Sequence, residues 1–184
     1  MAISRYTRLT EEDYDIKLRE MGNYLWELEQ EADLASQRGD EPAVAERETR
    51  IQRIGKKAYA FSQMAGCHRA LALYIAGLAS RMVRQWETAV SRFLEVVQMM
   101  PSNGEAWLEL TWCLAEMGKW KESEIAARKS AEFMPNSEAA WSNLAIALHR
   151  LGRATEAEAA IKKALDLEPN DPRNRKILEM VKGG

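Results

Sequence analysis

One segment recurs in phase along the second half of the chain. Pro101, Pro135 and Pro169 are evenly spaced, and Trp107 and Trp141 keep the same spacing. A fixed period of roughly 34 residues is the sequence sign of a repeat architecture, in which one unit cannot bury its apolar face alone. The period therefore restricts this part of the chain to an array of stacked, similar units.

Each copy contains two amphipathic helical patterns separated by a short turn. In the copy at 138–171, apolar residues recur at steps of mostly three and four, first from Trp141 to Leu148 and again from Ala157 to Leu167, which is the spacing of an amphipathic helix. Gly152 lies between the two patterns, where a helix commonly ends in a left-handed residue. Pro169 then ends the second helix, because proline cannot continue a helix interior.

In its period and its helix–turn–helix pattern, this unit resembles the tetratricopeptide repeat (TPR). Three units are expected, at 70–103, 104–137 and 138–171. The third fits the repeat signature best, whereas the first has Leu73 in place of the tryptophan and Arg84 in place of the turn glycine. The resemblance implies an α-α superhelix with a concave face that holds a peptide or a partner helix. It also implies that Trp107 and Trp141 are buried between neighbouring units.

The segment 1–66 lies outside this resemblance and predicts an antiparallel helical hairpin. From Tyr14 to Ala35 the apolar residues alternate at steps of four and three, the seam of a coiled coil. Gly39-Asp40 interrupts the pattern, and a second long helix follows to about Ala65. We therefore expect an all-α fold with a coiled-coil-like hairpin at 1–66, a TPR array at 67–184 and a capping helix at 172–182.

The two hairpin helices carry opposite charges, and this pattern has two interpretations. The first helix is rich in acids, including Glu29 and Glu31, and the second carries Arg47, Arg50 and three further basic residues. The charges either pair across the hairpin or form a basic stripe that binds an acidic partner.

Composition favours a non-catalytic protein in a reducing compartment. The net charge of -2 offers no electrostatic basis for nucleic-acid binding. The only cysteines, Cys67 and Cys113, are expected to be free, buried thiols, as in a cytoplasmic protein. His68 and His149 lie far apart, and no closely spaced set could supply four zinc ligands. The sequence also has no glycine-rich phosphate loop, so we expect no enzyme activity, metal or cofactor.

The first helix of each unit should present its non-core residues to the concave face. These candidate binding residues are, in chain order, Tyr74, Leu78, Arg81, Glu105, Glu109, Trp112, Glu116, Asn143, Ile146, His149 and Arg150. Asn143 stands where some TPR domains bind a C-terminal carboxylate, but the lysines of such sites are missing. An apolar centre with acids beside it favours a ligand with an apolar anchor and basic neighbours.

Trp112 is the residue most suited to dominate binding, because tryptophan is enriched at binding hot spots. Alternatively, it packs within the array against Leu78 and Ile146. We therefore expect an adaptor whose groove binds a protein segment. Two alternatives remain open: a structural oligomeriser that forms a homodimer through the hairpin or the array ends, and a secretion-type chaperone.

Overall fold

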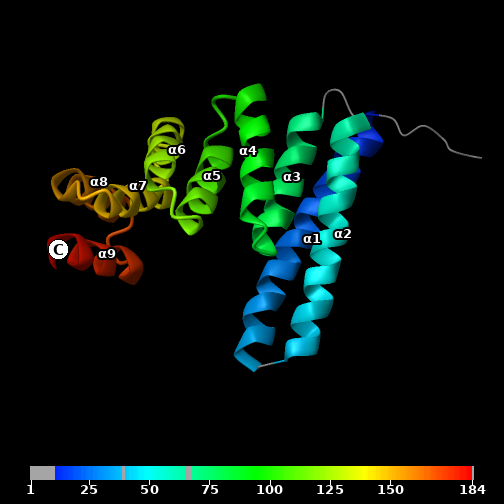
Figure 1. Ribbon diagram of the computed structural model, residues 1–184, viewed down its shortest axis with the longest axis horizontal. Helices are drawn as coiled ribbons and strands as arrows, with labels where there is room; N and C mark the ends of the chain where they lie inside the picture. Colours follow the sequence, from blue (N-terminus) through cyan, green and yellow to red (C-terminus); the bar gives the residue numbers. More distant parts are fainter. Residues whose placement is uncertain (1–10, 39, 65–67, 184) are drawn as a thin grey trace, which may run out of the picture. The chain divides into compact units, whose positions relative to one another are not determined.

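The computed structural model describes residues 11–38, 40–64 and 68–183, and all its regular elements are α-helices (Figure 1). The prediction of an all-α fold is therefore confirmed. The helices are α1 (Glu11–Arg38), α2 (Glu41–Met64), α3 (Arg69–Met82), α4 (Trp86–Met99), α5 (Gly104–Glu116), α6 (Trp120–Phe133), α7 (Glu138–Arg150), α8 (Ala154–Leu167) and α9 (Pro172–Gly183).

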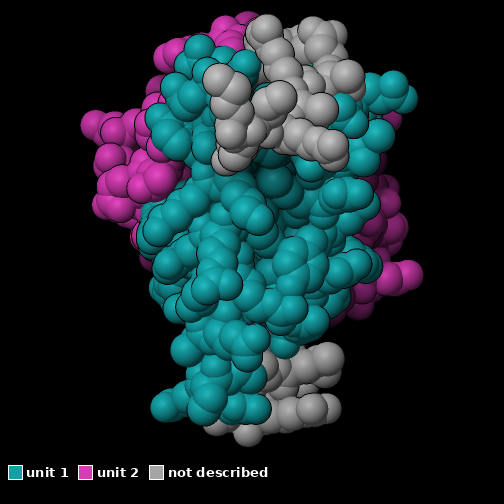
Figure 2. Space-filling view, turned by 90° about the vertical axis from the view of Figure 1, so that its right-hand side faces the viewer, with its two compact units in different colours: residues 1–85 teal, residues 86–184 magenta. Residues whose placement is uncertain are grey.

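The chain forms two compact units, Met1–Gln85 and Trp86–Gly184, which Figure 2 distinguishes by colour. Helix α3 packs against α1 and α2, so it belongs to the first unit. The sequence predicts a different domain boundary, near residue 66, from the phase of the repeat. That boundary stays a prediction.

The core of the first unit follows the heptad spacing of α1. Leu18, Leu25 and Leu28 are buried there and pack in one cluster with Ile51 and Ile54 of α2. Helices α1 and α2 are the long antiparallel pair in Figure 1. The seam positions beyond residue 31 lie outside the side chains that the structure describes. The apolar stripe that the sequence predicts is thus the surface on which the hairpin closes.

Some of the opposite charges on the hairpin do pair. The guanidinium Nη1 of Arg50 on α2 lies 3.8 Å from the carboxylate Oε2 of Glu31 on α1. Glu29 instead binds Arg81 of α3, with 2.9 Å between its Oε1 and the guanidinium Nη2. Part of the charge pattern therefore holds α3 against the hairpin.

In the second unit, helices α5, α7 and α9 begin with one capping arrangement. The side chains of Asn103, Ser137 and Asp171 accept hydrogen bonds from backbone N–H groups at the starts of these helices. Such caps satisfy N–H groups that have no partner inside the helix. Helix α9 therefore begins as the first helix of a repeat does.

The turns between paired helices use left-handed residues at one repeat position. Gly118 has φ 69° and Gly152 has φ 74°. Arg84, one repeat before Gly118, adopts φ 59° although it carries a side chain. The prediction that a helix ends in a left-handed residue at Gly152 is confirmed.

The repeat tryptophans are less buried than the sequence predicts. Trp107 and Trp141 are each only partly buried. The indole Nε1 of Trp107 donates a 2.8 Å hydrogen bond to the carbonyl oxygen of Pro101. The Nε1 of Trp141 donates one of the same length to the carbonyl oxygen of Pro135. The indole edge must therefore reach the turn at the surface, and this position keeps part of the ring exposed.

Helix α9 closes the core of the second unit. Its Ile177 and Val181 are 7% and 4% exposed and join the apolar cluster of α7 and α8. Lys176 and Lys182 on the same helix are exposed. An apolar side toward the array and a charged side toward water are what a terminal cap requires, and this part of the fold prediction is confirmed.

An ionic network links α6 to α8. The carboxylate of Glu156 accepts hydrogen bonds from Arg153 at 2.6 Å and from Arg128 at 2.9 Å. Glu124 accepts from the same two arginines. The pKa of Glu156 lies below its ordinary value. The hydrogen bond from Arg153 makes the largest contribution to this shift, and the hydrogen bond from Arg128 makes the next largest.

Candidate functional site

Helix α5 carries a stripe of three acids and one tryptophan. Glu105, Glu109, Trp112 and Glu116 follow one another at steps of four, three and four, so they share one side of the helix. Glu105 and Glu116 are exposed, Glu109 is partly buried, and Trp112 is 46% exposed. Because α7 packs against α5, this stripe borders the space between the two helices.

A cavity of about 460 Å³ lies between α5, α6, α7 and α9. Five of the predicted binding residues line it: Glu109, Trp112, Glu116, Asn143 and Ile146. Leu108, Ala115, Ala139 and Ala147 add apolar surface to the same walls. A cavity of several hundred Å³ with mostly apolar walls and a few polar groups is typical of a ligand site.

Trp112 and Ile146 meet at this cavity from α5 and α7. Nearly half of the Trp112 side chain stays accessible, which is unusual for a large aromatic residue in a packed array. The exposed indole surface is therefore available to a ligand in the cavity.

Three predicted residues lie on α5 or α7 but do not line the cavity. Glu105 lies in the first turn of α5, and His149 and Arg150 lie in the last turn of α7. The Arg150 guanidinium lies 5.2 Å from the ring centre of Trp120. Since Trp120 does line the cavity, Arg150 supports its wall from outside.

The remaining predicted residues belong to the first unit. Leu78 packs against the core of that unit, and Tyr74 is partly buried on α3. Arg81 is only 8% exposed and is bound to Glu29. The cavity within the second unit therefore contains none of these three residues.

Trp120 and Arg173 are among the residues that line the cavity but were not predicted for binding. Trp120 belongs to α6, the second helix of its repeat, and Arg173 belongs to α9. Arg173 stands one repeat after Ala139, another cavity residue. Extending the repeat phase into α9 would have identified it.

The charges around the cavity are unevenly placed. Glu109 and Glu116 border it from α5, whereas Arg173 borders it from α9. The cavity therefore has negative charge along one wall and positive charge at another. Such an arrangement fixes the direction of a charged ligand more than it adds to affinity.

Of the two cysteines expected to be buried thiols, Cys113 lies on α5 and is buried, without a disulfide. Cys67 lies outside the residues that the structure describes.

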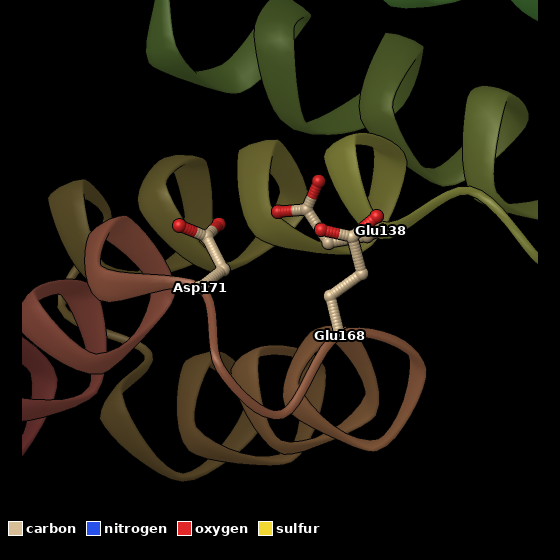
Figure 3. Close-up of side chains that lie close together, drawn as sticks. All are labelled: Glu138, Glu168 and Asp171. Atoms are coloured by element: carbon tan, nitrogen blue, oxygen red, sulfur yellow. The ribbon is translucent and has the colours of Figure 1, made fainter.

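Three carboxylates gather elsewhere, at the start of α7 and at the turn between α8 and α9 (Figure 3). Oxygen atoms of Glu138, Glu168 and Asp171 lie within 4.8 Å of one another, and carboxylates are ligands for hard cations such as Ca²⁺. However, Glu138 stands in the first turn of α7 and Asp171 caps α9. Helix N-termini stabilise negative side chains, so two of the three acids have a structural explanation.

Residues 138–171 match the family model described as tetratricopeptide repeat. No curated protein sequence matches the chain. None of the described helices combines the length and the apolar character needed to cross a membrane.

Several solved structures share the fold. A MamA RS-1 double mutant has a TM-score of 0.68 at 16% identity, with 89% of this chain and 85% of that chain covered. The first TPR of Spaghetti (RPAP3), bound to an HSP90 peptide, has a TM-score of 0.61 at 19% identity, covering 64% of this chain and 97% of that one.

The type III secretion chaperone SycD of Yersinia enterocolitica, in complex with a peptide of the translocator YopD, has a TM-score of 0.56 at 21% identity. The match covers 60% of this chain and 89% of that one. Residues 138–171 are therefore a tetratricopeptide repeat, and the chain is a helical-repeat protein with the fold of TPR domains.

Proposed function

We propose that this protein is a non-catalytic interaction module that binds a peptide or a partner helix between α5 and α7. The observation that carries the proposal is the half-exposed indole of Trp112 at the edge of a cavity of about 460 Å³. Covering that indole with a side chain of the ligand removes water from the ring surface, which is favourable. Trp112 is then the anchor of binding, and Asn143 supplies hydrogen bonds to the backbone of the ligand.

Two structures of the same fold support this type of binding. RPAP3 binds an HSP90 peptide of sequence SRMEEVD, and SycD binds a peptide of YopD. The acidic stripe of α5 argues for a different ligand from that HSP90 peptide, because Glu105, Glu109 and Glu116 repel acidic residues. We therefore expect a segment with an apolar anchor and basic residues. The buried thiol of Cys113, which forms no disulfide, supports action in the reducing cytoplasm.

The test is selection of random displayed peptides on the wild-type protein, followed by affinity measurements with Trp112→Ala, Asn143→Ala and the control Ile125→Ala. Ile125 is 60% exposed on α6 and does not line the cavity. Loss of a hot-spot tryptophan costs about 2 kcal/mol or more, so we expect at least about a thirtyfold weaker Kd for Trp112→Ala. Equal binding by wild type and Trp112→Ala would contradict the proposal.

One observation favours a second function, a scaffold that forms a homodimer through the hairpin. Trp26 on α1 is 64% exposed and Met64 on α2 is 70% exposed, and large exposed apolar residues can mark an interface. Light scattering over a range of concentrations tests this directly. A strict monomer at every concentration excludes it, whereas a dimer that Trp26→Ser dissociates supports it.

A secretion-type chaperone is a third function, supported by the fold shared with SycD. A chaperone of this type would bind its partner in the same groove, so the peptide selection described above also tests this function.

A further inference from the structure

The cavity combines two indoles with carboxylates, a combination that suits a cation. Trp112 and Trp120 both line it, together with Glu109 and Glu116. Glu116 is exposed and stands four residues after Trp112, so the two side chains are neighbours on α5. A cationic group over an indole face is attracted by the negative charge of the ring, and a carboxylate beside it adds a charge-assisted hydrogen bond.

The protein itself places a guanidinium on one of these rings. Arg150 lies 5.2 Å from the centre of the Trp120 ring, within the range of a cation–π contact. An indole in this wall therefore already has a guanidinium as a neighbour. Trp112, which is 46% exposed, offers further ring surface on the cavity side.

The remaining charges restrict where a ligand cation can lie. Arg173 borders the cavity from α9 and repels a second cation there. Along α5, Glu105, Glu109 and Glu116 provide up to three negative charges on one stripe. A ligand cation is therefore most stable at the α5 wall, while Leu108 and Ile146 remain for an apolar side chain.

We infer, on the basis of the proposed function, that the groove selects a protein segment with an arginine next to an aliphatic residue. The guanidinium contacts the Trp112 indole and the Glu116 carboxylate, and the aliphatic side chain packs on Leu108 and Ile146. Arginine fits better than lysine, because its planar group stacks on an aromatic ring and binds a carboxylate through two hydrogen bonds.

The probes are peptides from the random library selected on wild type and counter-selected on Trp112→Ala. We expect arginine to be enriched at one position beside an aliphatic residue. One selected peptide is then synthesised with arginine, lysine or citrulline at that position; citrulline keeps the planar shape without the charge. Wild type should bind the arginine peptide about tenfold more tightly than the citrulline peptide, as a desolvated cation–π contact and a charge-assisted hydrogen bond together allow.

Glu116→Gln is the test variant and Glu122→Gln its control. Glu122 is exposed on α6 and does not line the cavity. Glu116→Gln should lose most of the preference for arginine over citrulline, and Glu122→Gln should keep it. Circular dichroism checks that both variants fold.

The outcomes separate this inference from the proposed function. If the selected peptides need Trp112 but show no enrichment of arginine, or bind equally well with citrulline, the inference is wrong and the groove still binds peptides. If no peptide depends on Trp112, both are wrong.

Discussion

The indole Nε1 of Trp141 donates a 2.8 Å hydrogen bond to the carbonyl oxygen of Pro135. Trp107 makes the same contact with Pro101, and in α9 the Nη2 of Arg175 reaches the carbonyl oxygen of Pro169 at 3.0 Å. The donor follows the acceptor at the same separation in all three pairs. A side-chain donor therefore ties the starts of α5, α7 and α9 to the turns before them, even where tryptophan is replaced by arginine.

This contact predicts the effect of replacing Trp141. Trp141→Phe keeps an aromatic ring but loses the hydrogen bond, so the free energy of unfolding should fall by about 1 kcal/mol. Trp141→Ala should cost about 2–3 kcal/mol, less than for a fully buried tryptophan, because the ring is only partly buried. Urea unfolding followed by circular dichroism measures both changes. Trp26→Phe is the control, since Trp26 is 64% exposed; an equal loss there would refute the role of the hydrogen bond.

The turn glycines predict a cost that depends on backbone conformation alone. Gly152 has a positive φ, and a Cβ added there would meet no atom within 4 Å. Gly152→Ala should therefore lower the free energy of unfolding by about 1 kcal/mol, the cost of a left-handed conformation for a residue with a side chain. Chemical unfolding measures it, with Ala159→Gly, on the exposed side of α8, as a control for helix propensity. A Gly152→Ala protein as stable as wild type would contradict this account.

The ionic network of α6 and α8 predicts a pH dependence. The pKa of Glu156 in the folded protein lies below its ordinary value of 4.5, so the folded state favours the charged carboxylate. Its stabilising contribution is present above pH 4.5 and is lost as the pH falls through the folded pKa. Glu156→Gln should therefore be less stable than wild type at neutral pH, and the difference should disappear in acid.

Thermal unfolding of both proteins from neutral pH into acid measures this difference. Glu158→Gln is the matched comparison, because the ion pair of Glu158 with Lys162 lies within one helix and its loss should change stability less. A difference between wild type and Glu156→Gln that stays constant with pH would exclude the network as its source.

The cap predicts the effect of removing α9. Deleting residues 172–184 uncovers the apolar surface of α7 and α8 that Ile177 and Val181 bury, so the shortened protein should melt earlier and self-associate. Ile177→Ala alone should cost about 2–4 kcal/mol, whereas Lys176→Ala, on the exposed side, should change little. If the shortened protein stays monomeric and melts as the full chain does, α9 is not a cap.

Local sequence patterns were enough to place the helices, their turns and the repeat. Spacing alone identified apolar positions that are buried, such as Leu148 and Ile161, because burial along a helix follows its 3.6-residue period. Gly152 marked a turn in the same way, since its backbone conformation is a local property. The hairpin seam was also readable, because Leu18, Leu25 and Leu28 fit the heptad spacing along one helix.

Which of the predicted binding residues share a cavity depends instead on the stacking of the helices. Trp112 and Ile146 come from different helices, and Arg173 from a third, so the cavity forms only when these helices stack. Arg81 lies on the side of its helix where the sequence predicts groove residues. In the structure it is buried and donates a hydrogen bond to Glu29, which is distant in the chain. A local period tells which side of a helix a residue occupies, but the partner on that side comes from contacts between segments far apart in sequence.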